Sequence, residues 1–97
     1  MINFIPDKGT VTYNDFNLNL AKPINSQTSF LKEDLLQIVF SNNYLLDLGW
    51  YPEGDINGNF VIQIVKDYDW DKPVYKKEID FCSDVFQKIN DALNSIE

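Results

Sequence analysis

The sequence contains no histidine and no arginine, and it has one cysteine and four glycines among 97 residues. Without histidine, a Ser–His–Asp triad and a histidine-ligated metal are both excluded. Without arginine there is no bidentate phosphate clamp, and the glycines do not match a phosphate-binding loop. The single cysteine, Cys82, excludes an internal disulfide and is expected to be a small packing residue. Any catalysis would have to depend on carboxylates, tyrosine or lysine. Because the common catalytic and metal-binding patterns are excluded, we predict no catalytic residue, cofactor or metal.

The composition is that of a globular domain. Hydrophobic residues make up 44% of the chain and aromatic residues 14%, well above the range of disordered chains. Ninety-seven residues suffice for one core, so we expect a single domain over residues 1–97. The sequence starts without a basic, then apolar, signal-peptide pattern, and no apolar run approaches about 20 residues. A reduced cytoplasmic location is the simplest expectation.

The charge balance is strongly acidic. Fifteen Asp and Glu stand against eight Lys, giving a net charge of -7, and thirteen of the acids lie from Glu33 onward. A field of this sign repels phosphate backbones and anionic lipids, so we expect no nucleic-acid or membrane partner. It would attract a basic protein. The alternative is that the charge serves only solubility.

Period-two alternation of apolar and polar residues predicts an antiparallel sheet. Ser41–Asn43 is a tight-turn sequence, and it favours a strand over a short helix in the segment before it. Asn57–Gly58 is typical of a hairpin turn in which both residues adopt positive φ. The strands are expected at about Phe16–Leu20, Asp34–Phe40, Tyr44–Tyr51, Phe60–Val65 and Val74–Ile79.

The C-terminal segment has helical periodicity. Ser83 is a plausible N-cap and Asp84 suits the positive end of a helix dipole. The apolar positions Val85, Phe86, Ile89, Leu93 and Ile96 share one helical face. The predicted fold is therefore α+β: an antiparallel meander of four to five strands with a C-terminal helix packed on one face.

A stretch rich in both acids and aromatic residues is the strongest candidate binding site. Six acids and one lysine lie between residues 47 and 71, interleaved with two Trp and two Tyr. Aromatic side chains anchor interfaces, while the surrounding charges steer and select the partner. Trp50 is expected in the core, and Trp70 either contacts a partner or folds back onto the sheet. The predicted partner-binding residues are Asp47, Tyr51, Glu53, Asp55, Asp67, Tyr68, Asp69, Trp70 and Asp71.

Two other uses of these acids are less well supported by the sequence. The segment from Glu53 begins like a calcium-binding EF-hand loop, but Ile64 occupies the position that requires a bidentate acid. A carboxylate-dependent hydrolase would require a partly buried acid with a raised pKa. A third possibility is an adaptor domain that pairs through its edge strand, Val74–Ile79.

Several segments resemble small bacterial immunity proteins of contact-dependent growth inhibition and related polymorphic toxin systems. They are Glu33–Gln37, Leu45–Pro52, Phe60–Lys66 and Asp69–Pro73, and the resemblance extends over roughly residues 30 to 96. It implies a cytoplasmic antitoxin that binds the C-terminal domain of its cognate toxin, as a monomer in a 1:1 complex, and blocks it. Many such toxins are nucleases with basic surfaces, which an acidic protein would suit. The resemblance identifies no individual binding residue.

Overall fold

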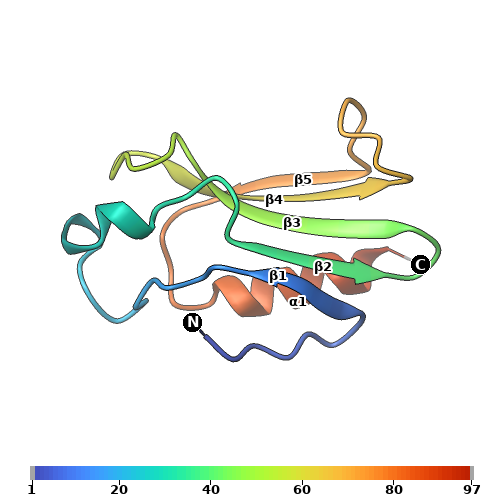
Figure 1. Ribbon diagram of the computed structural model, residues 1–97, viewed down its shortest axis with the longest axis horizontal. Coiled ribbons are helices and arrows are strands. Elements are labelled where there is room, and N and C mark those ends of the chain that lie inside the picture. The colour runs from blue at the N-terminus through green and yellow to red at the C-terminus, as the bar shows by residue number, and fades with distance from the viewer. Residues whose placement is uncertain (1, 97) are drawn as a thin grey trace.

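The computed structural model describes residues 2–96, which form one five-stranded sheet and one α-helix (Figure 1). Two short 3-10 helices lie in the connection between the first two strands. In chain order the elements are β1 (Thr10–Asn14), η1 (Ile24–Ser26), η2 (Thr28–Phe30), β2 (Leu36–Phe40), β3 (Tyr44–Tyr51), β4 (Asn59–Lys66), β5 (Tyr75–Ile79) and α1 (Val85–Ser95). The predicted α+β meander with a C-terminal helix is confirmed.

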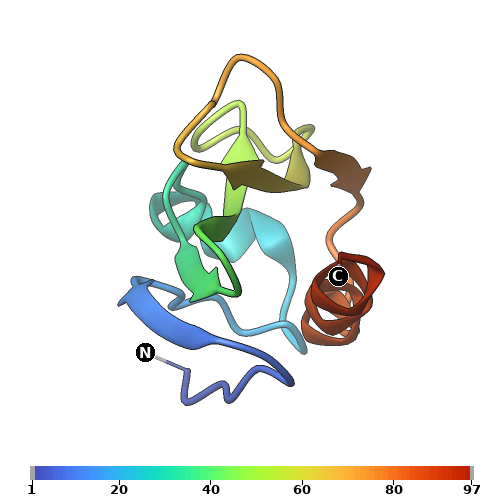
Figure 2. The same cartoon turned by 90° about the vertical axis from the view of Figure 1, so that its right-hand side faces the viewer.

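The strands follow one another in the sheet in the order β1-β2-β3-β4-β5, and every neighbouring pair is antiparallel. The sheet curves around α1, which lies on one of its faces (Figure 2). The other face has no helix over it and is turned toward the viewer in Figure 1. We call this second surface the open face.

The core lies between the sheet and α1. The even-numbered positions of β3, including Leu46, Leu48 and Trp50, point into it, as the alternation predicted. In β2 and β4 the buried residues Ile38 and Ile62 stand opposite β3 on the same side. The helix adds Val85, Ile89, Ala92 and Leu93, and Cys82 packs against the edge of this cluster. Burying this apolar surface is the main stabilising contribution to the fold.

The predicted first strand, Phe16–Leu20, is wrong. The strand lies earlier, at Thr10–Asn14, and residues 16–20 form an irregular segment whose Phe16 and Leu18 are buried. Polar side chains satisfy the backbone of this segment in place of a strand ladder. Asn14 Oδ1 accepts from Phe16 N at 3.0 Å, and Gln27 Oε1 accepts from Asn19 N at 2.6 Å. Short polar side chains compete with sheet hydrogen bonds in this way.

The β3–β4 connection also differs from expectation. It is a seven-residue loop, residues 52–58, and its positive φ occurs at Gly54 and not at Asn57 or Gly58. Gly58 is needed for close packing, because a Cβ there would overlap the Tyr51 carbonyl and the indole of Trp50. The Trp50 indole donates to the Asp55 carbonyl at 2.7 Å, which holds the loop against the core.

Three smaller features complete the fold. The helix begins at Val85 with Asp84, not Ser83, at the N-cap position, and the Asp84 side chain makes no capping bond. The β2–β3 turn has positive φ at Ser41, Asn42 and Asn43, as expected for a tight turn of small polar residues. Within residues 2–96, none of the helices has the length and apolarity needed to span a bilayer.

Gly49 is required by the approach of another chain segment. The backbone before β2 crosses close to it, with Trp50 N donating to Lys32 O at 2.8 Å and Leu35 N donating to Leu48 O at 3.0 Å. A Cβ at position 49 would overlap the Glu33 carbonyl. The absence of a side chain therefore allows residues 32–35 to continue the pairing of β2 with β3.

Gly49→Ala is expected to lower the free energy of unfolding by about 3 kcal/mol, because the new methyl group forces the two segments apart. Gly54→Ala is the control: Gly54, unlike Gly49, has positive φ, but the nearest atom to a Cβ there is 3.9 Å away. It should cost only about 1 kcal/mol of backbone strain. Urea denaturation measures both, and equal losses would contradict the close approach at Gly49.

Candidate functional site

The open face carries a row of polar side chains across its middle. Hydrogen-bond register places Gln37 of β2, Asp47 of β3, Gln63 of β4 and Lys76 of β5 side by side. The residues above and below this row are mostly apolar. Polar and charged side chains are seldom buried at the centre of a sheet, so this row is a candidate site.

Asp47 is the central member of this row and is only 3% exposed. Its Oδ1 accepts one hydrogen bond from Gln37 Nε2, at 3.1 Å. Burial raises the pKa of Asp47 to about 6; the Gln37 hydrogen bond opposes the shift and the negative charge of Asp34 adds to it. Neither of the two ion pairs within residues 2–96 involves Asp47. The chain thus holds a carboxylate in a poorly solvated position without a cation beside it.

Tyr51 lies on the same face, two positions beyond Gly49. Its ring lies back toward that glycine, since a Cβ there would come within 2.9 Å of ring atom Cε2. Burial raises the pKa of Tyr51, and the negative charges of Asp47, Glu33 and Asp34 raise it further. Three acids from two segments therefore converge on one tyrosine.

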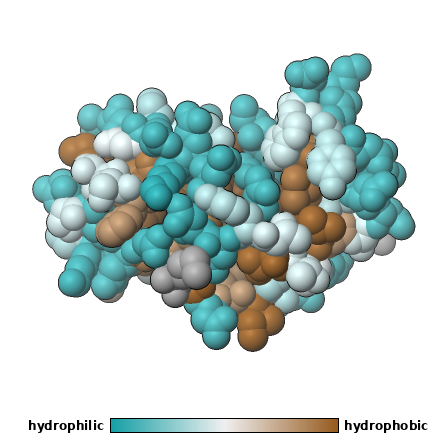
Figure 3. Space-filling view, in the orientation of Figure 1, coloured by the Kyte–Doolittle hydropathy of each residue, from teal (hydrophilic) through white to brown (hydrophobic). Residues whose placement is uncertain are grey.

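A groove of about 310 Å³ opens beside Tyr51. Its lining consists of Tyr51, Val61, Gln63, Lys76 and Glu78, from β3, β4 and β5. Figure 3 shows this face to be largely hydrophilic over the strands, with hydrophobic surface gathered nearer the β4–β5 loop. The groove thus combines one aromatic ring, one amide and charges of both signs.

The β4–β5 loop, residues 67–74, forms a separate feature at the opposite end of β3. Asp67 and Tyr68 both have positive φ, which is costly for a tyrosine. Asp67 N donates to Asn43 O, and Asn43 Nδ2 donates to Asp67 Oδ1, both at 3.1 Å, so the loop is tied to the β2–β3 turn. Tyr68 is 70% exposed and Trp70 44%, so the indole of Trp70 is only partly folded back onto the protein.

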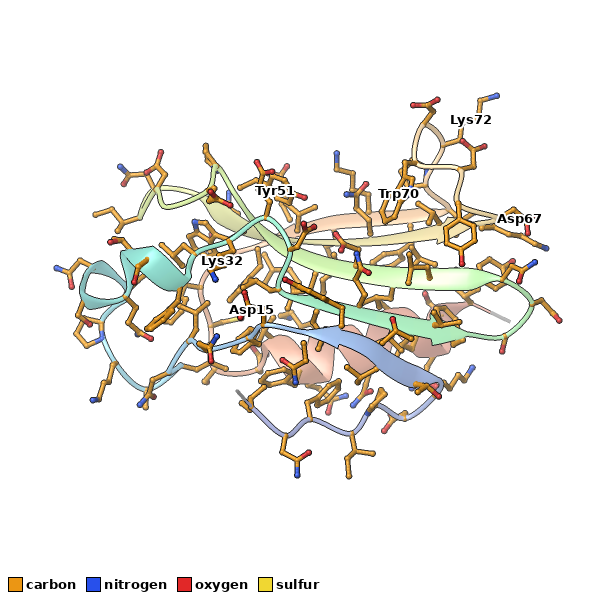
Figure 4. The ribbon with its side chains drawn as sticks, in the orientation of Figure 1. Asp15, Lys32, Tyr51, Asp67, Trp70 and Lys72 are labelled. Carbon is orange, nitrogen blue, oxygen red and sulfur yellow. The ribbon has the colours of Figure 1, made fainter. Side chains whose placement is uncertain are left out.

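The structure therefore divides the predicted site into two. Asp67, Tyr68, Asp69, Trp70 and Asp71 lie in the β4–β5 loop, whereas Tyr51, Glu53 and Asp55 lie at the other end of the sheet; Figure 4 shows Tyr51 and Trp70 apart. The ends of β3, Tyr44 and Tyr51, are seven residue steps apart, which spans about 23 Å. Asp47 lies between the two groups. Trp50 is buried in the core, as predicted.

Sequence reasoning missed six residues of the open face: Glu33, Asp34, Gln37, Gln63, Lys76 and Glu78. Glu33 and Asp34 precede β2 and reach Tyr51 only because the chain crosses β3 at Gly49. Gln37 and Gln63 interrupt apolar strands at the position that pairs with Asp47. Aligning β2 with β3 from the Ser41–Asn43 turn would have placed Gln37 beside Asp47, whereas the position of Gln63 depends on the longer β3–β4 loop.

A second, larger groove has a different character. It measures about 540 Å³ and lies between the N-terminal segment, residues 16–21 and Ser83. Its lining is apolar or amide-bearing and contains no charged side chain. It has no evident connection to the acids of the open face.

Comparison with known proteins found no matching family model, no similar curated protein and no similar solved structure. Within residues 2–96, no group of three or more Cys, Asp or Glu side chains is arranged to hold a metal ion. The open face with its polar row is thus the candidate site on physical grounds alone.

Asp47→Asn is expected to stabilise the protein at neutral pH. The folded pKa of Asp47, about 6, lies above its ordinary value of 3.8, so the charged form is disfavoured on folding. Its penalty is absent below pH 3.8 and grows as the pH rises through 6. Asparagine keeps an acceptor for Gln37, so the free energy of unfolding of the variant should be about 2 kcal/mol higher than that of the unsubstituted protein at pH 8. This difference should become smaller toward pH 4.5. Urea denaturation across this range measures it.

Asp15→Asn is the control with the opposite sign. Asp15 Oδ2 pairs with Lys32 Nζ at 2.8 Å, a contact visible in Figure 4, and this hydrogen bond lowers the pKa of Asp15. Its contribution to stability is present above the ordinary pKa of 3.8 and is lost as the pH falls. The substitution should therefore destabilise at pH 8. A stability loss in Asp47→Asn at pH 8 would contradict the burial cost assigned to Asp47.

Proposed function

We propose that this protein binds a basic protein partner through its open face and acts as an immunity protein of the polymorphic toxin type. The observation that carries the proposal is a sheet face, opposite α1, on which acids gather around a tyrosine and outnumber the one lysine that lines the adjoining groove. Catalysis is not required to explain this arrangement. Burial of such a face against a positively charged surface explains it directly.

The size of the open face suits an interface. The molecule measures 39 by 27 Å across the plane of Figure 1. The projected face is on the order of 1,000 Å², and a stable complex buries about 800 Å² per partner. The exposed Tyr68 and Trp70 at one end, and Tyr51 at the other, provide aromatic contacts of the kind that dominate binding energy.

The proposed mechanism is occlusion. A toxin that acts on nucleic acid needs a basic surface to hold phosphates. The open face offers carboxylates from Glu33, Asp34 and Glu78 at its surface, so it competes for that same basic area. Long-range attraction speeds the encounter, and contacts at the aromatic residues slow dissociation. Inhibition by this route requires no rearrangement of the backbone of the immunity protein.

A carboxylate-dependent hydrolase is a second candidate, and one observation favours it. Asp47 has a raised pKa and lies beside a groove, as a general acid would. However, the Asp47 carboxyl is almost fully buried, which restricts its contact with a substrate. Turnover of a glycoside or ester substrate that is lost in Asp47→Asn would support this candidate over binding.

The adaptor alternative receives less support from the strand arrangement. β5 does form an edge of the sheet. Its residues Lys76, Lys77 and Glu78 are all exposed, and charges on an edge strand discourage further strand pairing. A dimer that persists at high salt would favour this alternative.

The test uses the C-terminal domain of a secreted toxin-like protein encoded beside this chain. That domain should bind the protein 1:1 in calorimetry and lose its toxicity in cells that produce it. Glu78→Lys, on the open face, should weaken binding about tenfold, because it places a like charge against the partner. It should also make the affinity less sensitive to salt.

Asp91→Lys is the matched control. Asp91 is also exposed and undergoes the same change of charge, but it lies on α1 in the opposite layer. The affinity of this variant for the toxin domain should stay within about twofold of that of the unsubstituted protein, apart from the general effect of net charge. Replacing both Asp69 and Asp71 by lysine tests whether the β4–β5 loop, at one end of the open face, contributes to binding. Failure of the encoded domain to bind, or equal losses in Glu78→Lys and Asp91→Lys, would overturn the proposal.

A further inference from the structure

We propose that the groove beside Asp47 receives an arginine side chain of the partner, with its guanidinium group between the Asp47 carboxylate and the Tyr51 ring. This inference rests on the proposed function and names the chemistry of the contact at its centre. It commits the open face to one occupant: a basic segment whose arginine enters at the middle of the sheet.

Asp47 forms no ion pair with a cation of the described residues. Asp47 is 3% exposed and accepts a hydrogen bond from the neutral Gln37 amide at 3.1 Å. The two ion pairs that the described residues form, Lys32 with Asp15 and Lys88 with Asp84, leave it without a positive partner. A buried carboxylate is stabilised most by a cation that hydrogen-bonds to it. Lys76, the lysine of the polar row, is separated from Asp47 by Gln63, so we expect a partner to supply this cation.

The groove lies next to Asp47 along the polar row. Gln63 is the cross-strand neighbour of Asp47, and Tyr51 lies four residues further along β3 on the same face. Both side chains line the groove. Asp47 itself does not line the groove, so contact with a ligand there requires the Gln63 side chain, its neighbour in the polar row, to change rotamer. Such rotamer changes are common when interfaces form.

The side chains that line the groove suit an arginine better than a lysine. A guanidinium group is planar, stacks on aromatic rings and donates up to five hydrogen bonds. The groove offers a ring at Tyr51, an amide oxygen at Gln63 and the carboxylate of Glu78, and Asp47 lies next to Gln63 in the polar row. An ammonium group would use the charge but not the flat ring surface. Arginine also loses less hydration than lysine when it enters a partly buried site.

The charges around Asp47 favour the same occupant. Asp34 acts on Asp47 from the segment before β2, Asp34 and Glu33 both act on Tyr51, and Glu78 lines the groove from β5. Lys76, also on β5, is the one lysine that lines the groove. It is exposed and separated from Asp47 by Gln63 in the polar row, and it forms no ion pair with Asp47. The negative groups therefore outnumber the positive one at this position.

The experiment titrates the whole protein with N-acetyl-arginine amide and follows it by NMR at pH 7. The expected result is saturable shifts of the Asp47 carboxyl carbon and of the Gln37 and Gln63 side-chain amides. N-acetyl-citrulline amide has nearly the same shape without the charge and should produce no saturable shift. N-acetyl-lysine amide should bind several-fold more weakly. Equal binding of arginine and citrulline, or of arginine and lysine, would overturn the assignment.

Two further measurements keep the inference falsifiable. Asp47→Asn should weaken binding of the arginine amide about tenfold or more, whereas Asp91→Asn, the same change on α1, should leave it unaltered. In the unsubstituted protein, the titration midpoint of the Asp47 carboxyl carbon should fall when the arginine amide is present, because a bound cation favours the charged form. An unmoved midpoint would contradict direct contact.

The two proposals can fail separately. If the encoded toxin domain binds but neither arginine amide nor Asp47→Asn has the expected effect, the arginine contact is wrong and the immunity function stands. If the arginine amide binds at Asp47 and the toxin domain does not bind, the site is real but the proposed function is wrong.

Discussion

The structure depends on one constraint: the sheet has two faces and the chain supplies one helix to cover them. α1 buries the face formed by the even-numbered residues of β3, and that burial contributes most of the stability. The open face is exposed to solvent and has no covering helix among residues 2–96. It combines tightly packed apolar residues, such as Val65 and Leu45, with a polar row at the middle. The candidate site is a consequence of this division between the two faces.

The same constraint explains why the site is assembled from distant parts of the sequence. The long β3–β4 hairpin separates the acids of its two ends, although they belong to one continuous acidic stretch. In exchange, Glu33 and Asp34 come close to Tyr51 because residues 32–35 continue the pairing of β2 with β3. Gly49 permits this approach, so one residue without a side chain links the packing of the fold to the charge of the open face. Sequence proximity is a poor guide to such a surface.

Much of the fold followed from alternation in the sequence, because β2, β3 and β4 each bury one side and keep the period of two that burial imposes. The helix followed in the same way from the stripe that includes Ile89 and Leu93. Residues 16–20 also alternate, but Asn14, Asn19 and Gln27 satisfy their backbone locally, so no strand forms. At the candidate site, residue type identified Asp47 and Tyr51, whereas Glu33, Asp34 and Glu78 depend on strand register and chain crossing. Those are tertiary features that composition does not encode.

Asp47 connects stability with the proposed role. A carboxylate in this position opposes folding at neutral pH, and an asparagine or a small apolar residue would suit the isolated domain better. The fold tolerates the carboxylate because Gln37 hydrogen-bonds to it and because a raised pKa allows it to take up a proton. Residues that reduce the stability of a domain while lying beside an open groove are characteristic of binding sites. A cation supplied by a partner would remove the unfavourable term, so part of the binding free energy would come from relief of a cost already present in the free protein.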